Sequence, residues 1–285
     1  MAESTRIQSL AMLLETSGQA YLAELYGKTI ENVQKQLLSA TMKNMELSGD
    51  PASGSVEVKR FANASGAAYG TARAAGAGSK VKVRPVVIQI DQDREIVEEL
   101  EDKDVKLFGV EGVMGRRASN HALRMAAELD KAFFAAANTA ATKVTITGDP
   151  AVEDELETII QECENTSNLF VDGVDRSMMH LVLSTAYYGK IRNELDKKMN
   201  ANVDTADEEF YAWHGVRCDS CVHLPEGCDY LLICDGAVAQ PAMSDAYTAE
   251  KIPLSNAYGV SLFYNYGTKV VTPDLIFRKK LSSES

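Results

Sequence analysis

The feature that most constrains this sequence is a stretch of small residues between two strand-like segments. Of the 18 residues from 62 to 79, eight are alanine and four are glycine. The flanking segments, Val56–Phe61 and Val81–Ile90, alternate polar and apolar residues or are rich in valine, as β-strands are. Because side chains this small cannot build a core, the pattern predicts a long hairpin arm that projects from a body and packs on something else. A flexible surface loop fits the same residues, so both interpretations stay open.

Charge changes sign abruptly where this segment ends. Residues 55–90 hold six basic residues and one acidic residue, whereas residues 91–104 hold eight acidic and two basic residues. Such blocks can fix register between identical chains, pair within one chain, or form two solvated surfaces. We expect them to meet between copies. The basic set is Lys59, Arg60, Arg73, Lys80, Lys82 and Arg84. The acidic set is Asp91, Asp93, Glu98, Glu99, Glu101 and Asp102, within the segment Asp91–Asp104.

Helical periodicity marks the N-terminal segment and the middle of the chain. Residues 1–48 carry apolar residues at three- and four-residue spacing, which predicts helix interrupted at Gly18 and Gly27. Residues 116–141 form the clearest pattern, and at about 1.5 Å per residue that helix extends roughly 40 Å. Asp149 followed by Pro150 is typical of a helix start.

Short apolar segments in the second half of the chain predict strands, with one helix among them. Helices and strands do not alternate regularly, and no internal repeat is visible, so the predicted fold class is α+β. The predicted strands lie at Met178–Leu183, Val216–Val222, Tyr230–Cys234, Val238–Ala239 and within Ile252–Phe277, and the helix at Ala186–Met199.

Composition excludes several functional classes. The 285 residues suggest about two domains and are enough to fold without disulfide staples. A net charge of −12 argues against a protein that binds nucleic acid or a membrane surface through basic residues. No apolar run is long enough to span a membrane, and no signal peptide is recognisable, so we expect no membrane partner and synthesis in the cytosol. The five cysteines are expected to be reduced.

One cluster of residues has the composition of a metal site. Cys218 and Cys221 have the spacing of a zinc knuckle, and His223 or Cys228 could complete four ligands. The second half lacks a matching paired spacing, however, and the segment also fits two strands joined by a turn. We therefore predict buried, reduced cysteines and no metal, and keep zinc binding as an alternative.

Other catalytic patterns fail on inspection. Gly27-Lys28-Thr29 ends like a phosphate loop, but position 22 is leucine where that motif needs glycine. The sequence has no Gly-x-Ser-x-Gly nucleophile motif. His121 and His180 stand alone in a predicted helix and strand, where a structural role is expected. We predict no cofactor and no enzymatic activity.

The order of elements resembles the major capsid protein of tailed bacteriophages, which has the Hong Kong 97 fold. The resemblance covers about residues 44–277, and its motifs are loose patterns whose order and spacing carry the match. These are Val81–Pro85 leading into Asp91–Asp104, Lys103–Phe108, Met125–Asp130, Asp175-Arg176, His180–Ser184, Leu224-Pro225, Asp229–Leu232 and Gly236–Pro241.

The resemblance implies an architecture with named parts. It implies an N-terminal helical arm (1–51), an extended loop (52–92), a peripheral domain (93–145) with a spine helix (114–142), an axial domain (146–245) and return strands of the peripheral domain (246–285). It gives no residues for a covalent link between subunits.

The resemblance also implies a function. The chain is expected to self-assemble into pentamers and hexamers of an icosahedral shell around phage double-stranded DNA. Portal, scaffolding or decoration proteins are implied partners, and the packaged DNA is contacted non-specifically. The implied location is the virion, after assembly in the cytoplasm of a bacterial host. An encapsulin-like nanocompartment shell shares this fold and is the main alternative; a small zinc-binding cytosolic module is a weaker one.

Overall fold

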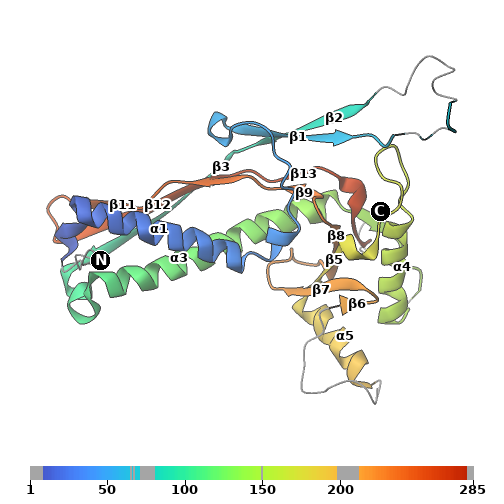
Figure 1. Ribbon diagram of the computed structural model, residues 1–285. Helices are drawn as coiled ribbons and strands as arrows, with labels where there is room; N and C mark the ends of the chain where they lie inside the picture. Colours follow the sequence, from blue (N-terminus) through green and yellow to red (C-terminus); the bar gives the residue numbers. More distant parts are fainter. Residues whose placement is uncertain are drawn as a thin grey trace. The chain divides into compact units, whose positions relative to one another are not determined.

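The computed structural model describes residues 9–64, 66, 68–70, 81–148, 150–197 and 212–280. The chain divides into two compact units that interleave along the sequence. The first comprises Met1–Ala40, Ile90–Asp130 and Pro241–Gly267, and the second comprises Thr41–Gln89, Lys131–Gln240 and Thr268–Ser285. Figure 1 shows the elements in sequence colours.

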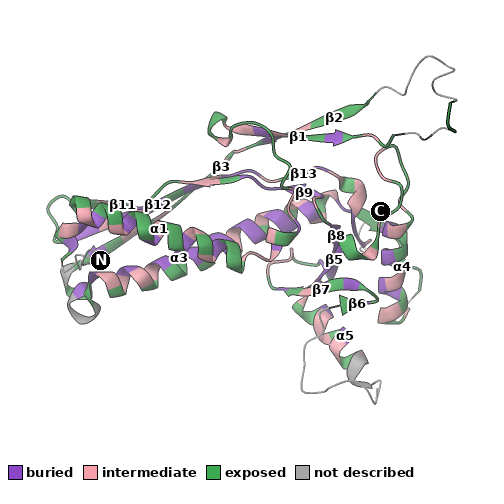
Figure 2. Cartoon of the chain, viewed as in Figure 1, coloured by how far each residue is buried: buried purple, intermediate pink, exposed green. Residues whose placement is uncertain are grey.

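The first unit packs helices against a narrow sheet. Strand β12 (Ala257–Tyr266) pairs antiparallel with β3 (Gln92–Glu101) on one side, and with β10 (Ala242–Ser244) and β11 (Thr248–Lys251) on the other. Helix α1 (Thr16–Gln36) and the first part of α3 (Asp102–Ala140) run alongside the β3–β12 pair. The core of this unit is buried between them, as Figure 2 shows in purple. Its members include Leu22, Leu25, Leu100, Val110, Met114, Val260 and Leu262.

Helix α1 is continuous, so the predicted interruption at Gly18 and Gly27 is wrong. A glycine costs about 1 kcal/mol inside a helix, which packing of the apolar face can outweigh. Gly18 lies directly against a preceding 3₁₀ turn, Leu10–Leu14, whose Leu10 and Leu13 are buried. The turn can approach the helix this closely because residue 18 has no side chain.

Helix does not extend to residue 48 as predicted. Helix α1 ends at Gln36, and a short 3₁₀ turn follows at Leu38–Thr41. Buried Asp130 binds that turn, accepting the Leu38 and Ser39 backbone N–H groups at 3.1 Å each and the Ser39 hydroxyl at 2.6 Å. The following residues pair with strands instead, since Ser48 bridges Glu57.

The second unit is built on a six-stranded mixed sheet. Its strands lie in the order β4 (Thr142–Val144), β14 (Ile276–Lys279), β8 (Tyr230–Cys234), β5 (Met179–Ser184), β7 (Val216–Cys221) and β6 (Ala212–Trp213). The β4–β14 and β5–β7 pairs are parallel and the others antiparallel. Helices α4 (Val152–Glu164) and α5 (Thr185–Lys197) pack on the sheet face that carries Met179, Leu181 and Leu183.

Helix α4 begins later than its sequence pattern predicts. It starts at Val152 after an extended Ala151, and no side chain caps it. Asp149, the predicted cap, lies outside the described residues. Glu153, Asp154 and Glu155 fill the first turn, where acidic side chains favour the partial positive charge of a helix N-terminus.

The predicted hairpin arm forms in the second unit from β1 (Ser55–Phe61) and β2 (Val83–Gln89), which pair antiparallel in full register. One face of the hairpin is buried. Val56, Val58 and Ile88 pack there with Ala239 of β9 (Val238–Ala239) and with Val271, which follows β13 (Lys269–Val270). Most of the small-residue tip lies outside the described residues.

Candidate interaction surfaces

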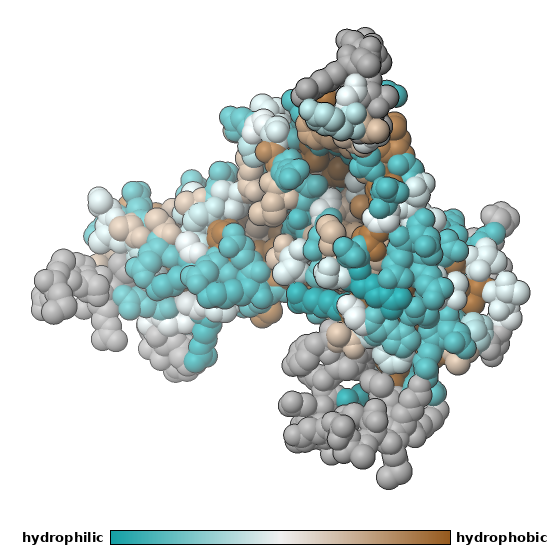
Figure 3. All heavy atoms as spheres, turned by 45° about the vertical axis from the view of Figure 1, so that its right-hand side comes forward, coloured by the Kyte–Doolittle hydropathy of each residue, from teal (hydrophilic) through white to brown (hydrophobic). Residues whose placement is uncertain are grey.

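The hairpin has one face that the rest of its unit leaves uncovered. In the β1–β2 register Lys59 lies opposite Pro85 and Phe61 opposite Val83, so these four side chains and Val87 share a face. Phe61 is 57% exposed, Val83 43% and Val87 41%. Apolar atoms interrupt the hydrophilic surface at the top of the view in Figure 3, where the hairpin lies. A strand pair with this much exposed apolar surface is typical of a protein contact site.

The predicted basic residues of the arm do not all share this surface. Lys59 lies on the exposed face together with Glu57, which is opposite Val87. Arg84 is exposed but lies opposite Arg60 and points to the other face, and Lys82 is exposed just before β2. Arg60 is instead buried and pairs with Asp274 at 2.5 Å in its own chain. Arg73 and Lys80 lie outside the described residues.

The acidic strand β3 presents its carboxylates on one face of the first unit. Side chains alternate along a strand, so Asp93, Glu95, Glu99 and Glu101 point to the outer face together with Val97, and all five are exposed. On the neighbouring strand β12, Phe263 lies opposite Glu95 and is 38% exposed. We call Asp93, Glu95, Val97, Glu99, Glu101 and Phe263 the acidic sheet face. It has apolar side chains at its centre and carboxylates around them.

Glu98 points the other way, into the first unit. It accepts hydrogen bonds from Arg117, the Nε donor at 2.6 Å, and lies 3.0 Å from Nε2 of buried His121. His121 contacts Tyr247 through Nδ1 at 2.9 Å. Burial opposes ionisation, but the bonds from Arg117 and His121 outweigh it and lower the pKa of Glu98. Glu98 therefore already has partners in its own chain. Asp91 is exposed just before β3, and the Asp102 side chain lies outside the described part.

The structure does not assemble the alternative zinc site. Cys218 and Cys221 are three positions apart in β7, so their side chains point to opposite faces of the sheet. Burial raises the pKa of the Cys218 thiol to about 12 and that of Cys228 to about 11, which disfavours the thiolate that zinc needs. Among the described residues, no three His, Cys, Asp or Glu side chains come together as metal ligands. The closest thiols are Cys163 and Cys234, whose buried Sγ atoms are 3.4 Å apart.

A buried polar cluster in the second unit was not predicted from sequence. Glu155 accepts the Tyr230 hydroxyl at 2.9 Å and the Tyr187 hydroxyl at 3.2 Å, and its other oxygen lies 2.7 Å from Nζ of Lys279. Burial and the Glu155 charge raise the pKa of both tyrosines, so neither is a base at neutral pH. Both carboxylate oxygens of Glu155 therefore have partners. The cluster links α4 to α5, β8 and β14.

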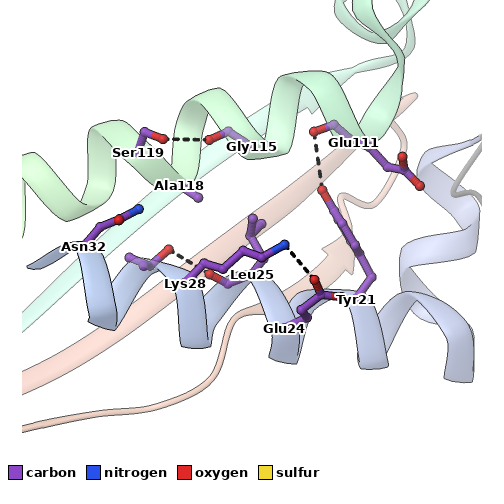
Figure 4. A pocket seen from close by; sticks show the side chains of 10 residues that line it. Tyr21, Glu24, Leu25, Lys28, Asn32, Glu111, Gly115, Ala118 and Ser119 are labelled. Carbon is purple, nitrogen blue, oxygen red and sulfur yellow. Dashed lines mark hydrogen bonds and ion pairs between the residues drawn. The ribbon is translucent and has the colours of Figure 1, made fainter. Parts of the chain in front are cut away.

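A groove of about 250 Å³ in the first unit lies between α1 and α3. Figure 4 shows Tyr21, whose hydroxyl donates to the Glu111 carbonyl at 3.3 Å, and the Lys28–Glu24 pair at 2.6 Å. Burial raises the pKa of Tyr21 to about 12. The groove's described lining contains no histidine or cysteine, and Gly115, Ala118 and Ser119 form its wall on α3. It offers no nucleophile paired with a base.

A charge network on the surface of the second unit ties α4 to two turns. Arg176 pairs with Glu157 at 2.7 Å and with Glu164 at 2.6 Å, and His214 Nδ1 lies 2.6 Å from Glu157. Arg176 also donates to the His214 carbonyl at 2.9 Å. Hydrogen bonds from Arg176 and His214 lower the pKa of Glu157 to about 2.

This network predicts acid sensitivity. Because the folded-state pKa of Glu157 lies below its ordinary value of 4.5, its stabilisation is complete above that value and is lost as pH falls from about 4.5 to 2. We expect the Tm of dissociated subunits to fall over this window, and to fall less in Glu157→Gln. Calorimetry from pH 6 to 2.5 measures both slopes, and equal slopes for the two proteins contradict this role of Glu157.

Comparison with solved structures identifies the architecture. A cyanophage P-SCSP1u capsid chain superimposes with a TM-score of 0.61 at 15% identity, over 86% of each chain. A chain of Mycobacterium phage Che8 gives 0.55 at 19% identity, over 81% of this chain and 86% of that one. A virus-like particle from Pyrococcus furiosus gives 0.58 at 12% identity, over 91% of this chain and 99% of that one. The chain has the Hong Kong 97-type capsid fold.

The fold predicted from the resemblance is therefore confirmed, including its α+β class. No protein-family model and no curated protein matches the sequence. No described helix has the length and hydropathy needed to cross a membrane. The contact residues and the domain boundaries expected from sequence stay predictions.

Proposed function

We propose that this chain is the major capsid protein of a tailed bacteriophage, a structural protein that assembles into pentamers and hexamers of an icosahedral shell. The observation that carries the proposal is the Hong Kong 97-type fold, found over most of the chain in proteins whose structures are described as capsids or as a virus-like particle. The uncovered face of the hairpin supports it, because a shell subunit needs surfaces that only other copies cover.

The contact between copies follows from the two exposed surfaces. The hairpin face around Phe61, Val83 and Val87 is apolar and carries exposed Lys59, whereas the acidic sheet face has Val97 and Phe263 among carboxylates. We propose that the first lies on the second in a neighbouring copy. Burial of the apolar side chains supplies most of the affinity. Exposed ion pairs contribute only about 0–1 kcal/mol each, but opposite charges set the register.

The remaining roles follow from a shell of this kind. Its contents are double-stranded DNA, contacted non-specifically at the inner wall, and an acidic subunit with a net charge of −12 suits a wall that must release its contents. Portal, scaffolding or decoration proteins of the same virus are the expected partners. Assembly takes place in the cytoplasm of the bacterial host, the shell ends in the virion, and the chain needs no catalytic activity.

An encapsulin-like compartment is the second candidate, and the match to 99% of the Pyrococcus furiosus virus-like particle chain favours it as an alternative. The contents of particles from the native source separate the two. We expect nuclease-resistant, genome-length double-stranded DNA after nuclease treatment of the outside. Particles filled with a second protein and free of DNA contradict the phage assignment and support the compartment.

A further inference from the structure

The end of the hairpin strand pair nearest the tip is held by a charged clamp within the second unit. Arg60 is the last inward-facing residue of β1, and it is 9% exposed. Its guanidinium binds Asp274 Oδ2 at 2.5 Å and lies 4.3 Å from the centre of the Phe170 ring. A buried guanidinium without an acceptor is costly, so these contacts define where Arg60, and with it the end of β1, can lie.

The second element of the clamp is the loop around Phe170. Asn168 donates from Nδ2 to the same Asp274 oxygen at 3.0 Å. Its Oδ1 accepts the backbone N–H groups of Phe170 at 2.8 Å and Val171 at 3.0 Å, which fixes the shape of the loop. The loop also holds the chain just beyond β1, since the Leu169 carbonyl accepts from the Asn63 backbone N–H at 2.9 Å.

The third element connects the clamp to the sheet. Asp274 lies in the short turn Pro273–Leu275, directly before β14. Ile276 and Phe277 of β14 are buried against β8. The Arg60–Asp274 pair therefore connects the hairpin to the core sheet.

We propose that Arg60, Asp274, Asn168 and Phe170 form an arm clamp that sets the direction of the hairpin in the free subunit. Arg60 is then a positioning residue and not, as its place in the basic block suggested, a contact for another copy. A clamp of this kind makes association more favourable, because less conformational freedom of the arm is lost when it docks. This consequence for assembly rests on the proposed function, whereas the ordering of the arm does not.

Amide hydrogen exchange on dissociated subunits tests the clamp. Asp274→Ala removes the shared acceptor, and Arg60→Asp combined with Asp274→Arg exchanges the two charges. We expect amides of 55–61 and 83–89 to exchange about tenfold faster in Asp274→Ala, the effect expected for loss of one hydrogen bond to a charged group. Amides of β5 and β8 should keep their rates, and the exchanged pair should recover most of the protection. Asp245→Asn, an exposed carboxylate in the first unit, is the control for charge alone.

Two results overturn the proposal. Unchanged exchange in the hairpin means that Asp274 does not order the arm. Equal acceleration in the hairpin and in β5 and β8 means that the cluster only stabilises the whole unit. If the hairpin loosens selectively but particles still form at the normal rate, the clamp stands and the role of the arm in the proposed shell is wrong.

Discussion

Reversing the charge on the exposed face of the arm, by Lys59→Glu, is expected to abolish shell assembly while leaving the subunit folded. The Lys59 side chain is exposed in the free chain, so the change should alter its stability by no more than about 0.5 kcal/mol. In the assembled shell this glutamate faces the carboxylates of the acidic sheet face. Like charges at an interface cost several kcal/mol per contact, and the contact repeats in every copy of the shell.

The measurement is light scattering and size-exclusion chromatography at a concentration at which the unmodified protein is fully assembled. The matched control adds Glu95→Lys and Glu99→Lys, which restores opposite charges across the contact and should restore particles. Normal particles from the arm variant alone contradict the contact. Failure of the compensated variant, with its subunits folded, shows that the arm meets a different surface.

The second large effect is expected at Gly18. A Cβ atom there would lie 2.0 Å from the carbonyl oxygen of Met12 and 2.4 Å from the Cα of Leu13, and both are backbone atoms that cannot turn aside. Gly18→Ala must push the Leu10–Leu14 turn away from α1, so it should destabilise the protein by about 1–3 kcal/mol or more. Gly27 lies in the same helix, and a Cβ atom added to it would meet nothing within 4 Å, so Gly27→Ala should stabilise by up to about 1 kcal/mol.

Urea unfolding of dissociated subunits compares the two variants. Opposite shifts of the unfolding midpoint, downward for Gly18→Ala and upward for Gly27→Ala, are the expected result. If both substitutions raise the midpoint, the turn does not pack on α1 as described, because helix propensity alone favours alanine at either position.

Local patterns in the sequence were enough to find most elements. The valine-rich segments around the small-residue stretch correspond to β1 and β2, and the predicted helix at 116–141 lies almost entirely within α3. The apolar segment Tyr230–Cys234 corresponds to β8 without any shift. Errors arose where tertiary contacts decide, as at Gly18, where close packing explains a glycine, and at residues 42–48, where strand pairing replaces helix.

The interaction surfaces were predictable in charge but not in geometry. Because side chains alternate along a strand, Glu98 points inward to Arg117 and His121 whereas its neighbour Glu99 points outward. The acidic composition of the segment does not distinguish the two residues. Arg60 and Asp274 are 214 residues apart, and the partners of Glu155 come from three other elements. Contacts between residues so distant in sequence leave no periodic signal, so composition and spacing could not reveal the clamp or the buried cluster.

Electron cryomicroscopy of the purified recombinant protein tests the central claim most directly. We expect closed shells or tubes of pentamers and hexamers, in which the β1–β2 hairpin of each copy covers the acidic sheet face of a neighbour and buries Phe61 and Val97. A stable monomer under assembly conditions contradicts the proposed function. A shell in which the hairpin face stays open to solvent contradicts the proposed contact.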